Sequence, residues 1–140
     1  MGKINFGRVL LGGLVAGLLM NIGEYLLNDK VLGSQMKEYF AQHNFPMPGG
    51  KAIGIAVVMV FVLGIVMILG YAAIRPRFGP GPKTAIITGL FAWFGVYFYG
   101  NVLAVAFGIF PSSLLPLVLG WGLIEYLLGA LVGAWVYKET

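Results

Sequence analysis

The stretch IGIAVVMVFVLGIVMILGYAAI, residues 53–74, decides the fold class because it contains no charged residue. A bilayer core about 30 Å thick needs roughly 20 consecutive apolar residues per spanning helix, and this stretch is long enough to cross it. Arg75 and Pro76 follow directly, and proline disfavours the helical conformation in the residue before it. The sequence therefore predicts a transmembrane helix over residues 53–74 that ends before Pro76.

Three further apolar stretches flank this one, and each predicts another spanning helix, over about residues 6–28, 84–107 and 114–137. The composition agrees, because 59% of the 140 residues are hydrophobic and 10% are charged. Soluble domains carry roughly 25% charged residues, so water is not the main solvent of this chain. We expect an all-α fold, a four-transmembrane-helix bundle that forms one domain over residues 1–140.

The segment between the first two spans, residues 29–51, is the longest part of the chain outside the predicted helices. Within it, Leu32, Met36, Tyr39 and Phe40 fall on one face at helical spacing, with polar side chains elsewhere. This pattern is typical of a helix that lies in the membrane interface. The sequence predicts a short amphipathic surface helix over Gly33–His43.

Lysine and arginine are distributed unequally between the two ends of the predicted bundle. The first loop holds Lys30, Lys37 and Lys51, whereas six basic residues lie in the termini and the second loop: Lys3, Arg8, Arg75, Arg77, Lys83 and Lys138. By the positive-inside rule both termini face the cytoplasm and the surface helix faces outward. These residues form no stripe or cluster, which argues against a nucleic-acid partner.

Glu24 and Glu125 are the most informative residues because an ionised carboxylate in hydrocarbon costs several kcal/mol. At about 1.5 Å per helical residue, Glu125 lies about 16 Å from the predicted helix start at Leu114, and Glu24 about 6 Å from Asn28. The sequence therefore predicts that the two acids lie at different depths and need not touch.

A polar pocket is the functional interpretation of these acids and of four other polar or aromatic residues inside the predicted spans. Its candidate members are Asn21, Glu24, Tyr97, Asn101, Trp121 and Glu125. An outward-open cavity with Glu125 at its floor would handle a proton or a cation. The structural alternative is a protonated glutamate that hydrogen-bonds a neighbouring helix, with Asn and Tyr as interhelical contacts.

Two glycine pairs are spaced for close helix packing: Gly13 with Gly17, and Gly129 with Gly133. Small residues four apart let two backbones approach, either within one chain or between two copies. We favour packing within the bundle over a homo-oligomer.

The residue types needed for most catalytic and metal chemistry are missing. Cysteine is absent, and His43 is the only histidine and lies in the first loop. No histidine pair is therefore present to bind a metal or a haem, and no Ser-His-Asp set can form. We expect no catalytic residue, no metal site, no cofactor and no enzyme activity.

Two segments carry a family resemblance: RPRFGPGPKTA at residues 75–85, and Trp121-Gly122-x-x-Glu125 followed by GAWVYK at residues 133–138. With these motifs the chain resembles small four-helix bacterial inner-membrane proteins to which no activity is assigned. The resemblance extends over most of the chain. It implies a multi-pass bundle in a bacterial inner membrane and carries no catalytic residue across.

Two classes of function remain open on this sequence. The first is a structural or accessory subunit of a larger membrane complex, whose partners are the lipid bilayer and another membrane protein or further copies of the chain. The second is a small proton- or cation-coupled transporter that uses Glu24 and Glu125. We favour the first, because nothing in the sequence indicates broken helices or the inverted repeats common in transporters.

Overall fold

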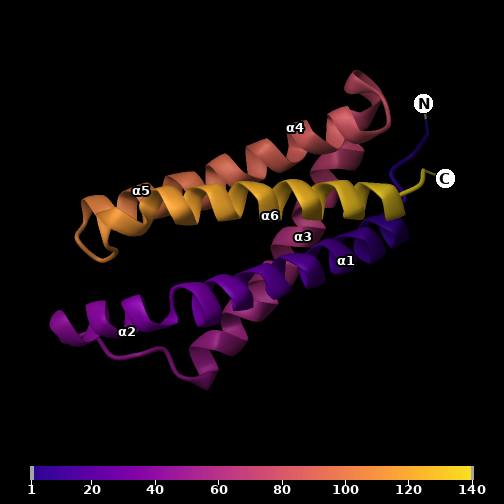
Figure 1. Cartoon of the computed structure of the whole chain (residues 1–140). Coiled ribbons are helices and arrows are strands. Elements are labelled where there is room, and N and C mark those ends of the chain that lie inside the picture. The colour runs from indigo at the N-terminus through magenta and orange to yellow at the C-terminus, as the bar shows by residue number, and fades with distance from the viewer. Residues whose placement is uncertain (1, 140) are drawn as a thin grey trace.

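The computed structural model describes residues 2–139, which are almost entirely helical (Figure 1). Short π-helical turns at Leu26–Val31 and Trp93–Phe98 join α1 to α2 and α4 to α5, and a 3-10 turn at Ser112–Leu114 leads into α6. The α-helices are α1 (Phe6–Tyr25), α2 (Gly33–Gln42), α3 (Gly50–Phe78), α4 (Pro82–Ala92), α5 (Tyr99–Ala106) and α6 (Leu115–Val136).

Four of the helical stretches in this part of the chain are long and apolar enough to cross a membrane: Phe6–Val31, Gly50–Phe78, Pro82–Ala106 and Ser112–Val136. Large apolar side chains on their outer faces are not covered by other parts of the protein: Phe91, Phe107 and Trp135 are 71%, 74% and 82% exposed. In water these faces would be strongly unfavourable, whereas lipid solvates them. The predicted all-α, four-span membrane fold is confirmed, and the outer faces contact the bilayer.

The second span is longer than the sequence predicted at both ends, because α3 runs over Gly50–Phe78 with Pro76 inside it. The expected end at Ile74 is therefore wrong. Pro76 has no N–H to donate to the Ala72 carbonyl one turn earlier, but the helix continues past it, and the Gly79 N–H still donates to the Arg75 carbonyl at 2.8 Å. Gly79 ends the helix instead, with a φ of 87° that suits glycine.

The four spans run up and down, so that both termini and the α3–α4 turn lie at one end of the bundle and α2 lies at the other (Figure 1). We call these the termini end and the α2 end. α1 packs against α3 and α6, and α4 packs against α6. In Figure 1, α1 and α6 lie close together near the termini and separate toward α2 and α5.

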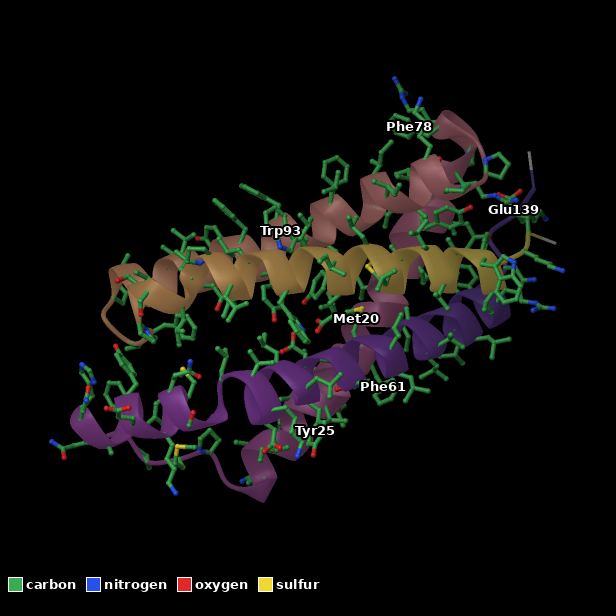
Figure 2. The ribbon with its side chains drawn as sticks, in the orientation of Figure 1. Met20, Tyr25, Phe61, Phe78, Trp93 and Glu139 are labelled. Atoms are coloured by element: carbon green, nitrogen blue, oxygen red, sulfur yellow. The ribbon has the colours of Figure 1, made fainter. Side chains whose placement is uncertain are left out.

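Glycines on three helices allow close packing in the half of the bundle toward the termini end. A Cβ at Gly12 would lie 2.6 Å from the Gly133 carbonyl oxygen, and one at Gly17 would lie 2.8 Å from the Phe61 Cα. Gly13 lies against the Ile65 backbone of α3, and Gly129 against Met20, which Figure 2 shows between α1 and α6. All four glycines singled out in the sequence thus contact neighbouring helices of the same chain.

Polar contacts tie the two terminal segments together at the termini end. The Asn5 backbone N–H donates to the Tyr137 hydroxyl at 3.3 Å, and Arg8 Nη1 donates to the Val136 carbonyl at 3.5 Å. Arg75 and Glu139 form an ion pair at 3.6 Å, and Figure 2 shows Glu139 beside the termini. The termini end is therefore held by both close helix contacts and polar bonds.

A short helix is present between the first two spans, as α2, which begins at Gly33 as expected and ends at Gln42, one residue early; its position on the membrane surface stays a prediction. Leu32 is buried at its start, and the Tyr39 hydroxyl donates to the Gly108 carbonyl at 2.7 Å. Since Gly108 lies in the loop between α5 and α6, this bond links α2 to the opposite helical hairpin. At the α2 end, this hydrogen bond therefore spans the opening between α2 and the α5–α6 loop, which we call the mouth.

Candidate functional site: two carboxyl groups beside a central cavity

The antiparallel packing of α1 on α6 brings Glu24 next to Glu125. Gly12 lies against Gly133, Met20 against Gly129, and Gly23 against the Glu125 side chain, so one register continues along both helices. The carboxyl groups of Glu24 and Glu125 are close enough to interact electrostatically.

The predicted separation in depth is therefore wrong. Helix ends need not lie at one level, because packing contacts and not loop positions set the register of two helices.

Glu125 is buried, with 6% of its surface exposed, and its carboxyl group contacts Gly23 of α1. The neighbouring Trp121 donates from Nε1 to the Gly23 carbonyl at 3.1 Å. Neither Glu125 carboxyl oxygen has a partner at hydrogen-bond geometry among the described residues. The carboxyl group of Glu24 lies beside that of Glu125, so a proton held between the two acids would give both a hydrogen-bond partner.

Glu24 is half-buried and is held by the residue one turn further along the chain. Asn28 Nδ2 donates to the Glu24 carboxylate at 3.0 Å and to its backbone carbonyl at 2.9 Å. Asn28 lies in the π-helical turn after α1, so the turn that leads to α2 also positions this carboxylate. Tyr97 and Tyr126 lie close enough to Glu24 to interact with it electrostatically.

A central cavity of about 490 Å³ lies between the four spans and includes Glu24 in its lining. Its other polar residues are Asn28, Tyr97, Asn101 and Tyr126. The rest of the lining is apolar and comes from every span: Leu27, Leu32, Ala56, Met59, Val60, Leu63, Val96, Phe110 and Val118.

A second cavity, of about 270 Å³, contains Glu125 and Trp121 in an otherwise apolar lining along α1 and α6. Glu24 therefore faces one cavity and Glu125 faces the other, while their carboxyl groups meet at the contact between the two helices. The second cavity opens on the lipid-facing surface, where Ile22, Ile124 and Leu128 of its lining are 49%, 63% and 48% exposed, so it leads from Glu125 to the bilayer.

The six residues predicted to form one polar pocket are divided among three places. Tyr97 and Asn101 line the central cavity with Glu24, and Trp121 lines the second cavity with Glu125. Asn21 lies in neither lining, because its Nδ2 donates to the Val57 carbonyl of α3 at 3.2 Å.

Tyr97 reaches the cavity because Gly122 of α6 leaves room for its ring, which a Cβ at that glycine would overlap. Its ring packs edge-on against Tyr126, with centroids 5.3 Å apart and planes at 81°. Tyr97 lies in the π-helical turn Trp93–Phe98, and such turns are frequent at functional sites. The Trp93 Nε1 donates to the Leu119 carbonyl at 2.9 Å and fixes this turn on α6 (Figure 2).

Three residues of the site were not predicted from the sequence: Gly23, Asn28 and Tyr126. Asn28 follows Glu24 by four residues, and that spacing places an amide beside a carboxylate on one helix face. Tyr126 follows Glu125 directly in the sequence, but its place in the lining depends on how α6 is rotated. No sequence pattern singles out Gly23, since only the α1–α6 register shows that Glu125 packs on it.

Among the described residues, no group of three or more His, Cys, Asp or Glu side chains is placed to hold an ion. His43 packs against the Tyr39 ring, with centroids 4.1 Å apart, in the segment next to α2.

Comparison of the chain with protein-family models, with curated proteins and with solved structures gave no significant match.

Proposed function

We propose that this multi-pass membrane protein is a small proton- or cation-coupled transporter in which Glu24 and Glu125 form one shared binding site. The observation that carries the proposal is their meeting at the α1–α6 contact, each facing a different cavity. Neither cavity is lined by a lysine, arginine or histidine among the described residues, so no protein cation neutralises the pair.

The chemistry of two adjacent carboxyl groups supports this role. Ionising both in apolar surroundings is costly, because like charges repel and hydrocarbon does not solvate them. A proton or a cation held between the two groups offsets that cost. An exchangeable cation then favours one arrangement of α1 and α6 over another, which is the coupling that a carrier needs. No covalent step is involved, so the proposed activity is not enzymatic.

The experiment is proton and monovalent-cation flux in vesicles that contain the purified protein. Wild type should carry flux under an imposed gradient, and Glu24→Gln and Glu125→Gln should each reduce it at least tenfold while leaving the fold intact. The double variant should lose no more than either single variant, because the two groups act as one site. Asp29→Asn is the matched control, since Asp29 is an exposed acid paired with Lys30 at 3.6 Å.

Absence of flux from folded wild type under every gradient, or normal flux in both glutamine variants, would contradict the proposal. The accessory-subunit prediction would then be the stronger one. Mass measurement of the intact complex from native membranes tests it, because a subunit would carry a stoichiometric partner or further copies.

The orientation proposed for transport has both termini in the cytoplasm of a bacterial cell. Six basic residues belong to the segments gathered at the termini end, against three in the segment that carries α2. A cytoplasm-only reporter fused after the carboxyl terminus should be active, and the same reporter inserted between α2 and α3 should be silent. The reverse pattern would invert the orientation.

A further inference from the structure

The central cavity is far larger than a proton or an inorganic ion requires. A water molecule occupies about 30 Å³ of liquid, so a cavity of about 490 Å³ has room for many waters, yet most of its lining is apolar. Sites for small organic ligands typically measure about 300–1,000 Å³ and combine apolar walls with a few polar groups. The size and lining therefore indicate an organic ligand.

We propose that the central cavity binds a monovalent organic amine with an apolar body, its ammonium group at Glu24 and its body among the apolar side chains of α3 and α6. This inference deepens the proposed transport function and rests on it for the meaning of the site. The equilibrium binding measurement described below does not require that transport occurs.

The charge of the lining selects a cation. Glu24 is the only ionisable carboxyl group among the described residues that line this cavity, and no basic residue accompanies it. An anionic ligand would be repelled by the Glu24 carboxylate, and no lysine, arginine or histidine is present among the described lining residues to offset that repulsion. This is strongly unfavourable in a partly apolar site. Ionising Glu125 as well as Glu24 is costly in apolar surroundings, so a ligand with two or more charges would leave all but one unpaired. One positive charge matches the site.

The hydrogen-bonding groups of the cavity are suited to a ligand that donates. The Asn101 amide nitrogen already donates to the Tyr97 carbonyl at 2.8 Å, which leaves its Oδ1 as an acceptor. Glu24 accepts from Asn28 at Oε2, and its carboxyl group also faces Tyr97 and Glu125. A protonated amine supplies up to three N–H donors, whereas a sugar needs many polar partners that this lining lacks.

Aromatic and apolar groups complete the site. Tyr97 and Tyr126 flank Glu24, and a cation near an aromatic ring face gains about 0.5–2 kcal/mol. The hydrocarbon part of the ligand would replace the water or lipid that contacts the residues opposite: Ala56, Met59, Val60, Leu63 and Val118. The carboxylate that would bind the ammonium group and the apolar side chains that would contact the ligand body thus line the same cavity.

The test compares three probes of similar shape and different charge: 4-phenylbutylamine, 4-phenyl-1-butanol and 4-phenylbutyrate. Binding is measured by calorimetry on wild-type protein in lipid nanodiscs at neutral pH, with empty nanodiscs as the correction for partition into lipid. We expect the amine to bind at least tenfold more tightly than the alcohol, and the carboxylate to show no binding above the correction.

Two variants locate the site. Glu24→Gln should bring the amine affinity to that of the alcohol, whereas the control Asp29→Asn should leave it unchanged. Ala56→Phe adds a ring from α3 into the cavity away from the carboxyl pair, so it should abolish amine binding. Thermal unfolding of each variant verifies that it is folded.

Equal affinity of amine and alcohol in wild type, or an unchanged amine preference in folded Glu24→Gln or folded Ala56→Phe, would overturn the inference. Apolar binding without charge preference would mean that the cavity holds lipid chains. The outcome is separable from the transport proposal. Ion flux with no amine binding overturns only the ligand assignment, whereas selective amine binding with no flux overturns only transport.

Discussion

The two ends of the bundle are built differently, and the difference explains where a site can form. At the termini end, glycines on α1, α3 and α6 allow close contacts, and buried Ala16, Ile68 and Ala130 fill the core. Toward the α2 end the helices separate around a cavity of about 490 Å³ that contains a carboxylate. Tight packing at one end supplies the stability that an open interior with a few polar groups at the other end does not.

Adding a methyl group to the tightly packed half should have the largest effect. A Cβ at Gly13 would overlap the Ile65 backbone, which has no side-chain freedom with which to move away. We expect Gly13→Ala to destabilise the bundle by about 3 kcal/mol, at the upper end of the cost of overpacking. Thermal unfolding in detergent measures it, and Gly54→Ala, where nothing lies within 4 Å, is the matched control. Equal effects at both positions would contradict the packing described.

Adding the same methyl group at the level of the acids should change function more than stability. A Cβ at Gly23 would overlap the Oε1, Cδ and Cγ atoms of Glu125, whose side chain can rotate into the cavity beside it. We expect the free energy of unfolding of Gly23→Ala to lie within about 1 kcal/mol of the wild-type value, since alanine also raises helix propensity. Ion flux should nevertheless fall about tenfold, because the carboxyl pair is separated. Gly120→Ala, in open space, should retain full flux.

Removing the hydrogen bond between Tyr39 and Gly108 at the α2 end should have a smaller effect. It should make the central cavity easier to reach from solvent. Tyr39→Phe removes the hydroxyl that donates to Gly108, a bond worth about 1 kcal/mol. Since the chain has no cysteine, Phe110→Cys places a unique thiol in the cavity lining. A water-soluble maleimide should label this thiol about fivefold faster when Tyr39→Phe is also present. An unchanged labelling rate would mean that the Tyr39 bond does not restrict the mouth.

The ion pair at the termini end should have the smallest effect of the four changes. Glu139→Gln removes the partner of Arg75 at 3.6 Å, where both side chains are about one-quarter exposed. Such pairs contribute at most about 1 kcal/mol, and salt screens them. We expect a loss of about 0.5 kcal/mol in thermal unfolding at low salt and none at 1 M salt. A loss that persists at high salt would indicate a role in packing.

Sequence patterns predicted the parts of this fold that depend on one helix at a time. Four spans and a short helix between the first two follow from local hydropathy and helical spacing, and the structure contains them. The end of α3 was missed because the effect of Pro76 depends on how many turns follow it. Gly79, not the proline, ends the helix by adopting a positive φ.

The candidate site depends on two helices at once, and there sequence reasoning was incomplete. Glu24 and Glu125 were singled out because a carboxyl group in a span is costly wherever it lies. Their meeting depends on the register of α1 against α6, which is set by Gly12 on Gly133 and by Gly23 on Glu125. Spacing within one helix gives no information about that register. For the same reason Asn21 was grouped with the acids although it bonds to α3.

The meeting of Glu24 and Glu125 is tested most directly by cross-linking a cysteine pair placed at these two positions. The chain has no other cysteine, so the Glu24→Cys, Glu125→Cys variant can be treated with a short bifunctional thiol reagent without side reactions. A protease site inserted between α2 and α3 then reports whether α1 and α6 remain joined after cleavage. The matched control pairs Glu24→Cys with Ala134→Cys, toward the termini end of α6.

We predict rapid cross-linking of the 24–125 pair within one chain, and none of the 24–134 pair under the same conditions. Joined fragments after cleavage would then come from the first variant alone. Failure of the 24–125 pair to cross-link in folded protein, or equal cross-linking of both pairs, would contradict the shared carboxyl site and the α1–α6 register that creates it.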